Sequence, residues 1–279
     1  MLWRNTNEAA SWVGEGIGDY GHIRHREDLD GVANSGIPLM AVFDTGEKQV
    51  SARLGKHWRI PALESIAYPK NENMYFVRMP DGRDITFVRG SDGVFGAEHF
   101  RGWSASKTKD TFHVKSRHGV ELVFKNGRLR KFRHPNDAFS TFHYENGRVV
   151  EISRAGTRQF HAEHKPNLLI FHTRHKQGKM IRHELSLARM EEDGKHLVRL
   201  SGICRNGVLR KTFVYKNETP GTARMELKAQ PVIFEELMEK YRKNNPDDFD
   251  DEIAAKIPAL DRIFSWDIKT GHAKLWRIG

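Results

Sequence analysis

A two-residue turn signal, Asp-Gly or Asn-Gly, recurs through the middle of the chain and restricts its fold more than any other feature. Between residues 37 and 215 it separates short stretches rich in β-branched and aromatic residues, such as residues 74–79 and 85–88. Type I′ hairpin turns need positive φ at both central residues, which these dipeptides tolerate. No helical periodicity intervenes, so we predict a mainly β chain of antiparallel meanders or sandwich-like sheets. The dipeptides of this region are Asp81-Gly82, Asp92-Gly93, Asn126-Gly127, Asn146-Gly147, Asp193-Gly194 and Asn206-Gly207.

The sequence divides into three segments. Residues 1–36 are rich in glycine and polar residues, and we expect an irregular entry segment that could contain one early strand. Residues 37–230 form the antiparallel β region. Residues 231–279 contain a short helical part, because four apolar residues recur at i, i+3, i+4 and i+7 from Phe234.

Two further elements are expected near the C-terminus. The acidic run at residues 247–252 is typical of the first turn of a helix, which indicates a second short helix. Trp266 and Trp276 flank a turn sequence and predict a terminal hairpin that packs on the sheet.

The composition excludes several classes of protein. The 279 residues contain no run of 18 apolar residues, so we expect no membrane insertion. One cysteine, Cys204, rules out an intrachain disulfide framework and a cysteine zinc site. Histidines are dense around His161, His164 and His172, but on a strand side chains three apart point to opposite faces. We therefore expect solvated histidines, no metal site and no cofactor.

The clearest repeated pattern joins two neighbouring stretches. The first runs from Phe124 through Asn126-Gly127 to Phe132, and the second runs from Tyr144 through Asn146-Gly147 to Ile152. Both read aromatic, x, Asn-Gly-Arg, aliphatic, x, x, apolar, and looser copies occur further along. We expect each copy to form one hairpin with its apolar residues in a core.

This pattern resembles the YD-repeat family of Rhs-type proteins, whose units read roughly Tyr-Asp, x, Asn-Gly-Arg-Leu, x, x, aliphatic. The resemblance is closest over residues 121–155 and extends over roughly residues 74–163. Here Phe124-Lys125 and Tyr144-Glu145 stand where the family has Tyr-Asp. Family members build extended β-sheet shells or envelope-associated scaffolds, and this chain is too short to close a shell. The resemblance therefore implies local sheet architecture built from YD-like hairpins.

The resemblance also implies a role. It favours a secreted or envelope-associated scaffold or binding module, with anionic polymers or glycoproteins as partners. Residues 1–12 lack the apolar stretch of a signal peptide, which fits a cytosolic protein or a secreted one without its leader.

An alternative hypothesis is an enzyme. Asp44-Thr45-Gly46 follows the apolar residues 39–43 and resembles the aspartic-peptidase signature. By that resemblance Asp44 activates a water, Thr45 fixes the carboxylates and Gly46 lets the backbone approach closely. Two carboxylates must share one proton in this mechanism. The chain has no second copy of the motif, so the partner would come from a homodimer, as in retroviral-type peptidases, or from Asp81 or Asp92. An ordinary strand-ending turn is the simpler interpretation.

The charge of +10 suggests a third hypothesis. Basic residues cluster at residues 107–133 with phenylalanines between them, and on a sheet they would form a positive face for a polyanion or nucleic acid. A solvated face that prevents edge-to-edge aggregation would look the same. The candidate polyanion-binding residues are Lys115, Arg117, Lys125, Arg128, Arg130, Lys131, Arg133 and Arg148.

Overall fold

The chain is mainly β, with antiparallel sheets. The computed structural model describes residues 16–17, 23–29, 37, 39–47, 51, 53–175, 178–192, 195–219, 222–244, 246, 261–270 and 272–278. One α-helix, α2 (Pro231–Asn244), occurs in these ranges, and it includes the predicted amphipathic stretch. The prediction of an antiparallel β chain with a C-terminal helix is confirmed. The second helix expected after residue 246 lies outside the described residues.

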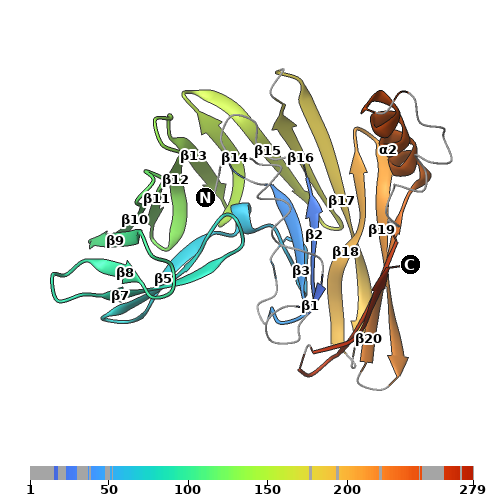
Figure 1. Cartoon of the computed structure of the whole chain (residues 1–279), viewed down its shortest axis with the longest axis horizontal. Helices are drawn as coiled ribbons and strands as arrows, with labels where there is room; N and C mark the ends of the chain where they lie inside the picture. The colour runs from blue at the N-terminus through green and yellow to red at the C-terminus, as the bar shows by residue number, and fades with distance from the viewer. Residues whose placement is uncertain are drawn as a thin grey trace.

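Eight consecutive strands close into a barrel, at the left of Figure 1. Each strand pairs antiparallel with the next, and β12 returns to β5 through Arg128 and Ile66. The seam also has a hydrogen bond of 2.9 Å from the Ala67 amide to the Gly127 carbonyl. Aromatic rings fill the interior, where Tyr75 stacks on Phe112 at 4.2 Å. The strands are β5 (Ile66–Asn71), β6 (Met74–Arg78), β7 (Asp84–Arg89), β8 (Phe95–Ala97), β9 (Trp103–Thr108), β10 (Thr111–Ser116), β11 (Glu121–Lys125) and β12 (Arg128–Arg133).

The sequence predicted antiparallel meanders or sandwich-like sheets, and the structure shows a more specific architecture, a closed barrel. Pairing between neighbouring strands follows from local turns, and the sequence shows it. Closure depends instead on how far the sheet curls before β12 meets β5, which turn dipeptides do not determine.

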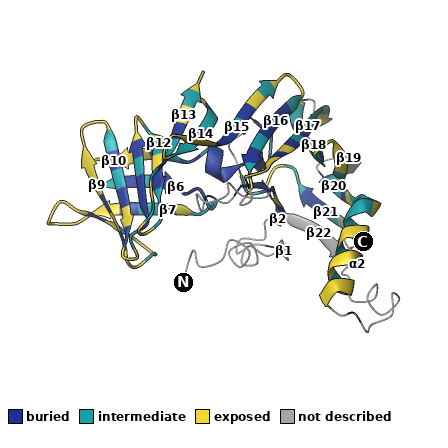
Figure 2. Cartoon of the chain, turned by 90° about the horizontal axis from the view of Figure 1, so that it is seen from above, coloured by how far each residue is buried: buried dark blue, intermediate teal, exposed yellow. Residues whose placement is uncertain are grey.

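The sheet continues beyond β12 as an open arc (Figure 2). The predicted terminal hairpin forms, and it joins the sheet as its last two strands because β21 pairs with β20. Helix α2 lies beside the long strands, and Arg210 of β19 pairs with Glu236 of the helix. The strands are β13 (Ser140–Glu145), β14 (Arg148–Arg154), β15 (Thr157–Lys165), β16 (Leu168–Arg174), β17 (Met180–Glu192), β18 (Lys195–Arg205), β19 (Val208–Thr219), β20 (Thr222–Ala229), β21 (Arg262–Asp267) and β22 (Ala273–Ile278).

The turn dipeptides form two kinds of hairpin. In the Asn-Gly turns both residues have positive φ, as at Asn126 (49°) and Gly127 (77°), which agrees with type I′. In the Asp81-Gly82 and Asp92-Gly93 turns only the glycine does. The prediction of type I′ at these Asp-Gly sites is therefore wrong. Their longer loops end on a left-handed glycine, as three-residue hairpin loops do.

The repeated hairpins also share an irregularity in how their strands pair. In four hairpins the third residue after the turn glycine has no partner in the register, which marks a β-bulge. The bulge explains the repeat spacing, because it places Leu129 and Phe132 on the same buried face although they are three residues apart. Val149 and Ile152 repeat this arrangement. The four unpaired residues are Arg130, Val150, Gln159 and Arg210.

A smaller sheet lies on the inner side of the arc (Figure 2). Its strands are β1 (Gly16–Ile17), β2 (Ile23–Asp28), β3 (Met40–Asp44) and β4 (Trp58–Arg59), followed by a 3-10 helix, η1 (Pro61–Leu63). Strands β1 and β2 fall in the segment that we predicted to be mostly irregular. Every residue of β3 is buried, so this sheet fills the arc.

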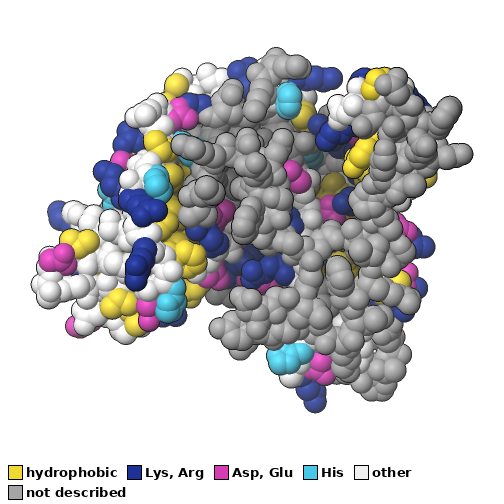
Figure 3. Space-filling view, viewed as in Figure 1, with side chains coloured by type: hydrophobic (Ala, Val, Ile, Leu, Met, Phe, Trp, Pro, Cys, Tyr) yellow, Lys and Arg dark blue, Asp and Glu magenta, His cyan; other side chains and the backbone are white. Residues whose placement is uncertain are grey.

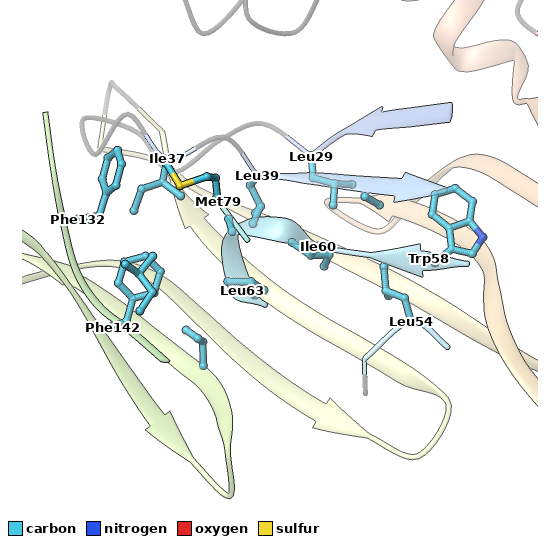
Figure 4. Packing of buried hydrophobic residues seen from close by; sticks show 14 of the residues in the cluster. Leu29, Ile37, Leu39, Leu54, Trp58, Ile60, Leu63, Met79, Phe132 and Phe142 are labelled. Atoms are coloured by element: carbon cyan, nitrogen blue, oxygen red, sulfur yellow. The ribbon is translucent and has the colours of Figure 1, made fainter. Parts of the chain in front are cut away.

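One hydrophobic core joins the three parts. Figure 4 shows its side chains running from Phe132 and Phe142 of the large sheet past Met79 and Leu63 to Trp58. The Trp58 indole donates a hydrogen bond of 2.6 Å to the Tyr215 hydroxyl, which fixes the small sheet against β19. No helix in the described ranges is long and apolar enough to cross a membrane.

Candidate functional site: an arginine-lined cavity

Most of the predicted basic face is neutralised by its own neighbours. Lys115 and Arg133 flank Glu121 on the outside of the barrel, with nitrogen–oxygen distances of 3.2 and 2.7 Å. Lys125 lies 3.5 Å from Asp110. In Figure 3 the basic side chains of the barrel are interspersed with acidic and histidine side chains. This face is a mixed surface rather than a continuous positive patch.

Other members of the predicted set pack on neighbouring rings. Arg130, the bulged residue, places its guanidinium 4.6 Å from the centre of the Tyr144 ring. Lys131 and Arg133 lie over Phe139, and Arg117 donates to His118 at 3.0 Å. The structure therefore does not bring the eight predicted residues together as one site.

Two of the eight, Arg128 and Arg148, meet at a cavity of about 250 Å³. Each follows an Asn-Gly turn, so the repeat places them alike. The Arg128 guanidinium lies against Gly147, where an added Cβ would be 3.0 Å from it. Neither arginine makes an ion pair with a carboxylate of the described residues. Both are exposed, so a ligand that enters the cavity can reach them.

Three buried arginines complete the lining: Arg53, Arg59 and Arg78. Arg59 donates to Glu47 at 2.9 Å and to the Gly82 carbonyl at 3.2 Å, while its Nε has no partner among the described residues. Arg78 shares Glu47 at 3.0 Å and also reaches Asp84. The Glu47 carboxylate thus forms ion pairs with two buried guanidinium groups.

Arg53 is buried and bonds to neutral groups. It is 5% exposed, and its guanidinium lies 2.8 Å from His164 Nε2 and donates to the Val149 carbonyl at 3.2 Å. Burial lowers the pKa of Arg53 to about 10. A buried cation that bonds only to neutral groups gains from any anion that reaches it.

The second acidic residue of the cavity, Glu64, is also buried. Burial raises the pKa of its carboxyl, although Ser51 Oγ donates to it at 2.6 Å and Arg53 is near. The cavity has five arginines and two glutamates, so it carries a net positive charge.

A second hollow, of about 600 Å³, adjoins the first. The two share Ser51, Arg53 and Arg148 in their walls. Aliphatic side chains of β16, β17 and β18 form much of the second lining, and its charged residues are all basic. We refer to the two together as the paired hollows.

The Asp-Thr-Gly motif has a local role. Asp44 accepts from the Gly46 amide at 2.8 Å, and Arg24 donates to its other oxygen at 2.9 and 3.0 Å. The two suggested partner carboxylates are engaged elsewhere, Asp81 with Arg83 and Asp92 with the Val94 amide. Asp44 closes the turn after β3, and the peptidase mechanism stays a prediction.

The histidines are less uniform than the sequence suggests. His161 and His172 face each other across β15 and β16, half-exposed, as expected for solvated strand faces. His183 is instead buried and stacks on Phe171 at 5.0 Å. Within the described ranges no group of three or more His, Cys, Asp or Glu residues is placed to hold a metal ion.

Sequence reasoning missed Arg53, Arg59 and Arg78. They come from three separate places, the loop between β3 and β4, strand β4 and strand β6, and no motif surrounds them. Only the Asn-Gly-Arg repeat gave a usable signal, and it identified Arg128 and Arg148. Comparison with models of known protein families and with curated proteins finds no match to this chain, so its function is argued from the paired hollows.

Proposed function

We propose that this protein is a scaffold and binding module built from YD-like hairpins, and that it binds an anionic ligand in the arginine-lined cavity. The same bulge in four hairpins supports the repeat interpretation, because it gives these hairpins the same shape. The ligand is an anionic polymer or the acidic part of a glycoprotein, outside the cell or at the cell envelope.

The observation that carries the proposal is the charge of the cavity. Five guanidinium groups and two glutamates of the described residues line a space of about 250 Å³, and burial raises the pKa of one of those glutamates, Glu64. Taking charges out of water is costly unless they are paired, and this cost applies to the buried Arg53, Arg59 and Arg78. Arg128 and Arg148 are exposed at the mouth of this space, where a ligand can reach them. A ligand carboxylate or sulfate in this space would bond to Arg128 and Arg148, which have no carboxylate partner in the described part of the chain. Arginine forks favour such planar or tetrahedral oxyanions.

A binding experiment tests this. The probes are polygalacturonate and heparin, measured by isothermal titration calorimetry at two salt concentrations. We expect Arg148→Gln to weaken binding of the preferred polymer about 10- to 100-fold, since a hydrogen bond to a charged group contributes about 1.5–3 kcal/mol. Binding should also weaken as salt rises.

Lys115→Gln is the matched control. It removes one positive charge from the outer barrel face, where Glu121 already neutralises it. We expect less than a twofold change. Equal losses in both variants would assign binding to the general charge of the protein and contradict the cavity site.

A further inference from the structure

The second hollow differs from the first in its chemistry. Six apolar residues, from the turn after β15 and from strands β16, β17 and β18, contribute to its lining: Pro166, Leu168, Leu169, Leu187, Leu197 and Val198. Leu169 is buried, while Leu168, Leu187 and Leu197 are half-buried and keep part of their surface accessible. An aliphatic surface of this kind beside a cationic wall suits a ligand that has an apolar part and an anionic part.

The charges around the second hollow are of one sign. Arg53, Lys56, Arg148 and Lys165 line it, together with His164 and His196, and none of the described residues in its lining is acidic. The first hollow has two glutamates, and one of them, Glu64, accepts a hydrogen bond of 2.6 Å from Ser51. The shared wall itself consists of Ser51, Arg53 and Arg148, so its two charged side chains are both cationic. An anionic group bound at the shared wall would therefore contact both hollows.

The shared wall is also held in position. His164 Nε2 at 2.8 Å and the Val149 carbonyl at 3.2 Å fix the Arg53 guanidinium before any ligand arrives. Ser51 Oγ accepts from the amides of Arg53 and Leu54, at 3.1 Å each, and so orders the loop that carries the arginine. A group fixed in advance loses little freedom on binding.

The lining argues against nucleic acid in the second hollow. Single-stranded nucleic acids bind through bases stacked on aromatic side chains. In the part of the chain that the structure describes, no Phe, Tyr or Trp lines this hollow. Tyr144 of the first hollow donates its hydroxyl to the Leu129 carbonyl at 2.8 Å and is covered by Arg128 and Arg130. Aliphatic walls instead favour a saturated chain.

We propose that the paired hollows form one site for an amphiphilic carboxylate, whose carboxylate bonds to Arg148 and Arg53 at the shared wall and whose aliphatic chain lies on the leucines of the second hollow. The volume of about 600 Å³ is within the range of small-molecule sites, about 300–1,000 Å³. This inference rests on the proposed function, because it uses the same arginines, and it adds the chemical class of the ligand.

The test is a chain-length series: acetate, butanoate, hexanoate, octanoate and decanoate, measured by isothermal titration calorimetry on the full chain below micelle formation. We expect one binding site and an affinity that rises about three- to fourfold for each added CH₂, since burying a CH₂ contributes about 0.8 kcal/mol. Octylamine should bind at least tenfold more weakly than octanoate. An affinity independent of chain length, or equal binding of octylamine, would overturn the inference.

Two variants separate the parts of the site. Leu168→Gln places a polar group in the second hollow and is expected to flatten the chain-length dependence. Leu209→Gln is its control, because Leu209 is a 40% exposed leucine of β19 that lines neither hollow. Arg148→Gln should weaken octanoate about 10- to 100-fold, whereas Arg101→Gln, at an exposed site in a barrel loop, should leave it unchanged. Equal effects within either pair would overturn the inference.

The two proposals fail differently. If polygalacturonate or heparin binds through Arg148 but the carboxylates show no dependence on chain length, the amphiphilic ligand is wrong and the anion site stands. If neither polymer nor carboxylate responds to Arg148→Gln, both proposals are wrong.

Discussion

Gly55→Ala is expected to cost more than about 4 kcal/mol of unfolding free energy, an effect at the extreme end for a single substitution. Gly55 has a φ of +83°, and an added Cβ would lie 1.6 Å from the Val198 carbonyl oxygen. The backbone cannot move away freely, because the next amide, of Lys56, donates to that same oxygen at 3.1 Å. The substitution should therefore detach the loop from β18. Urea unfolding followed by circular dichroism measures the cost.

Gly207→Ala provides the comparison. Gly207 has a similar φ of +80°, but an added Cβ would meet nothing within 4 Å. Only the left-handed conformation is then penalised, at about 1–2 kcal/mol. If both variants lost the same free energy, the contact between Gly55 and Val198 would not be part of the folded state. Since the loop also carries Arg53, Gly55→Ala should remove anion binding as well.

The second large effect is a loss of stability in mild acid. Burial, with help from Arg199 and Lys56, lowers the pKa of His57 to about 3, and burial with Arg205 and His172 lowers that of His183 to about 4. The ordinary histidine pKa is about 6.5. Above that value neither state binds the proton. As the pH falls below 6.5, these histidines become protonated in the unfolded chain but stay neutral in the folded chain. The unfolding free energy therefore decreases.

The size of the loss follows from the width of this window. From pH 6.5 to pH 4 each of the two histidines removes on the order of 3 kcal/mol. Glu64 acts in the opposite direction, because its raised pKa favours the folded state in acid. His164, whose pKa burial lowers to about 4, adds to the loss and offsets this contribution. Unfolding free energies measured at pH 7, 5.5 and 4 should fall steadily.

His183→Phe isolates one contribution. A phenylalanine retains the stacking on Phe171 but binds no proton, so the variant should lose about 3 kcal/mol less than the wild type between pH 6.5 and pH 4. His99→Phe, at an exposed histidine of a barrel loop, should follow the wild type. A His183→Phe protein with an unchanged pH profile would show that His183 is not the acid-sensitive group.

The hairpins could be predicted because their information is local. Asn126-Gly127 and Asn146-Gly147 tolerate the positive φ of a tight turn, and the alternating apolar residues on either side select the pairing. The regular bulge was not expected, although its trace is present in the repeat. Two buried positions three residues apart, such as Leu129 and Phe132, cannot share one face of a regular strand.

Of the candidate site, the sequence predicted only the two arginines that belong to the Asn-Gly-Arg repeat. Arg128 and Arg148 follow equivalent turns and do line one cavity. Most of the basic face at residues 107–133 did not become a site, because Glu121 and Asp110 lie among its cations in the folded sheet. A count of charges along the chain does not show which carboxylate will be the cross-strand neighbour.

By itself, the sequence determined the strands, the Asn-Gly hairpins, the amphipathic helix and the terminal hairpin, since these depend on residues a few positions apart. Tertiary structure alone decided the closure of the barrel at β5 and β12 and the assembly of the paired hollows. Arg53 meets His164 and Val149, which lie 111 and 96 positions away. Such contacts follow from how far the sheet curves and from where the small sheet fills it, and both are properties of the whole packed chain.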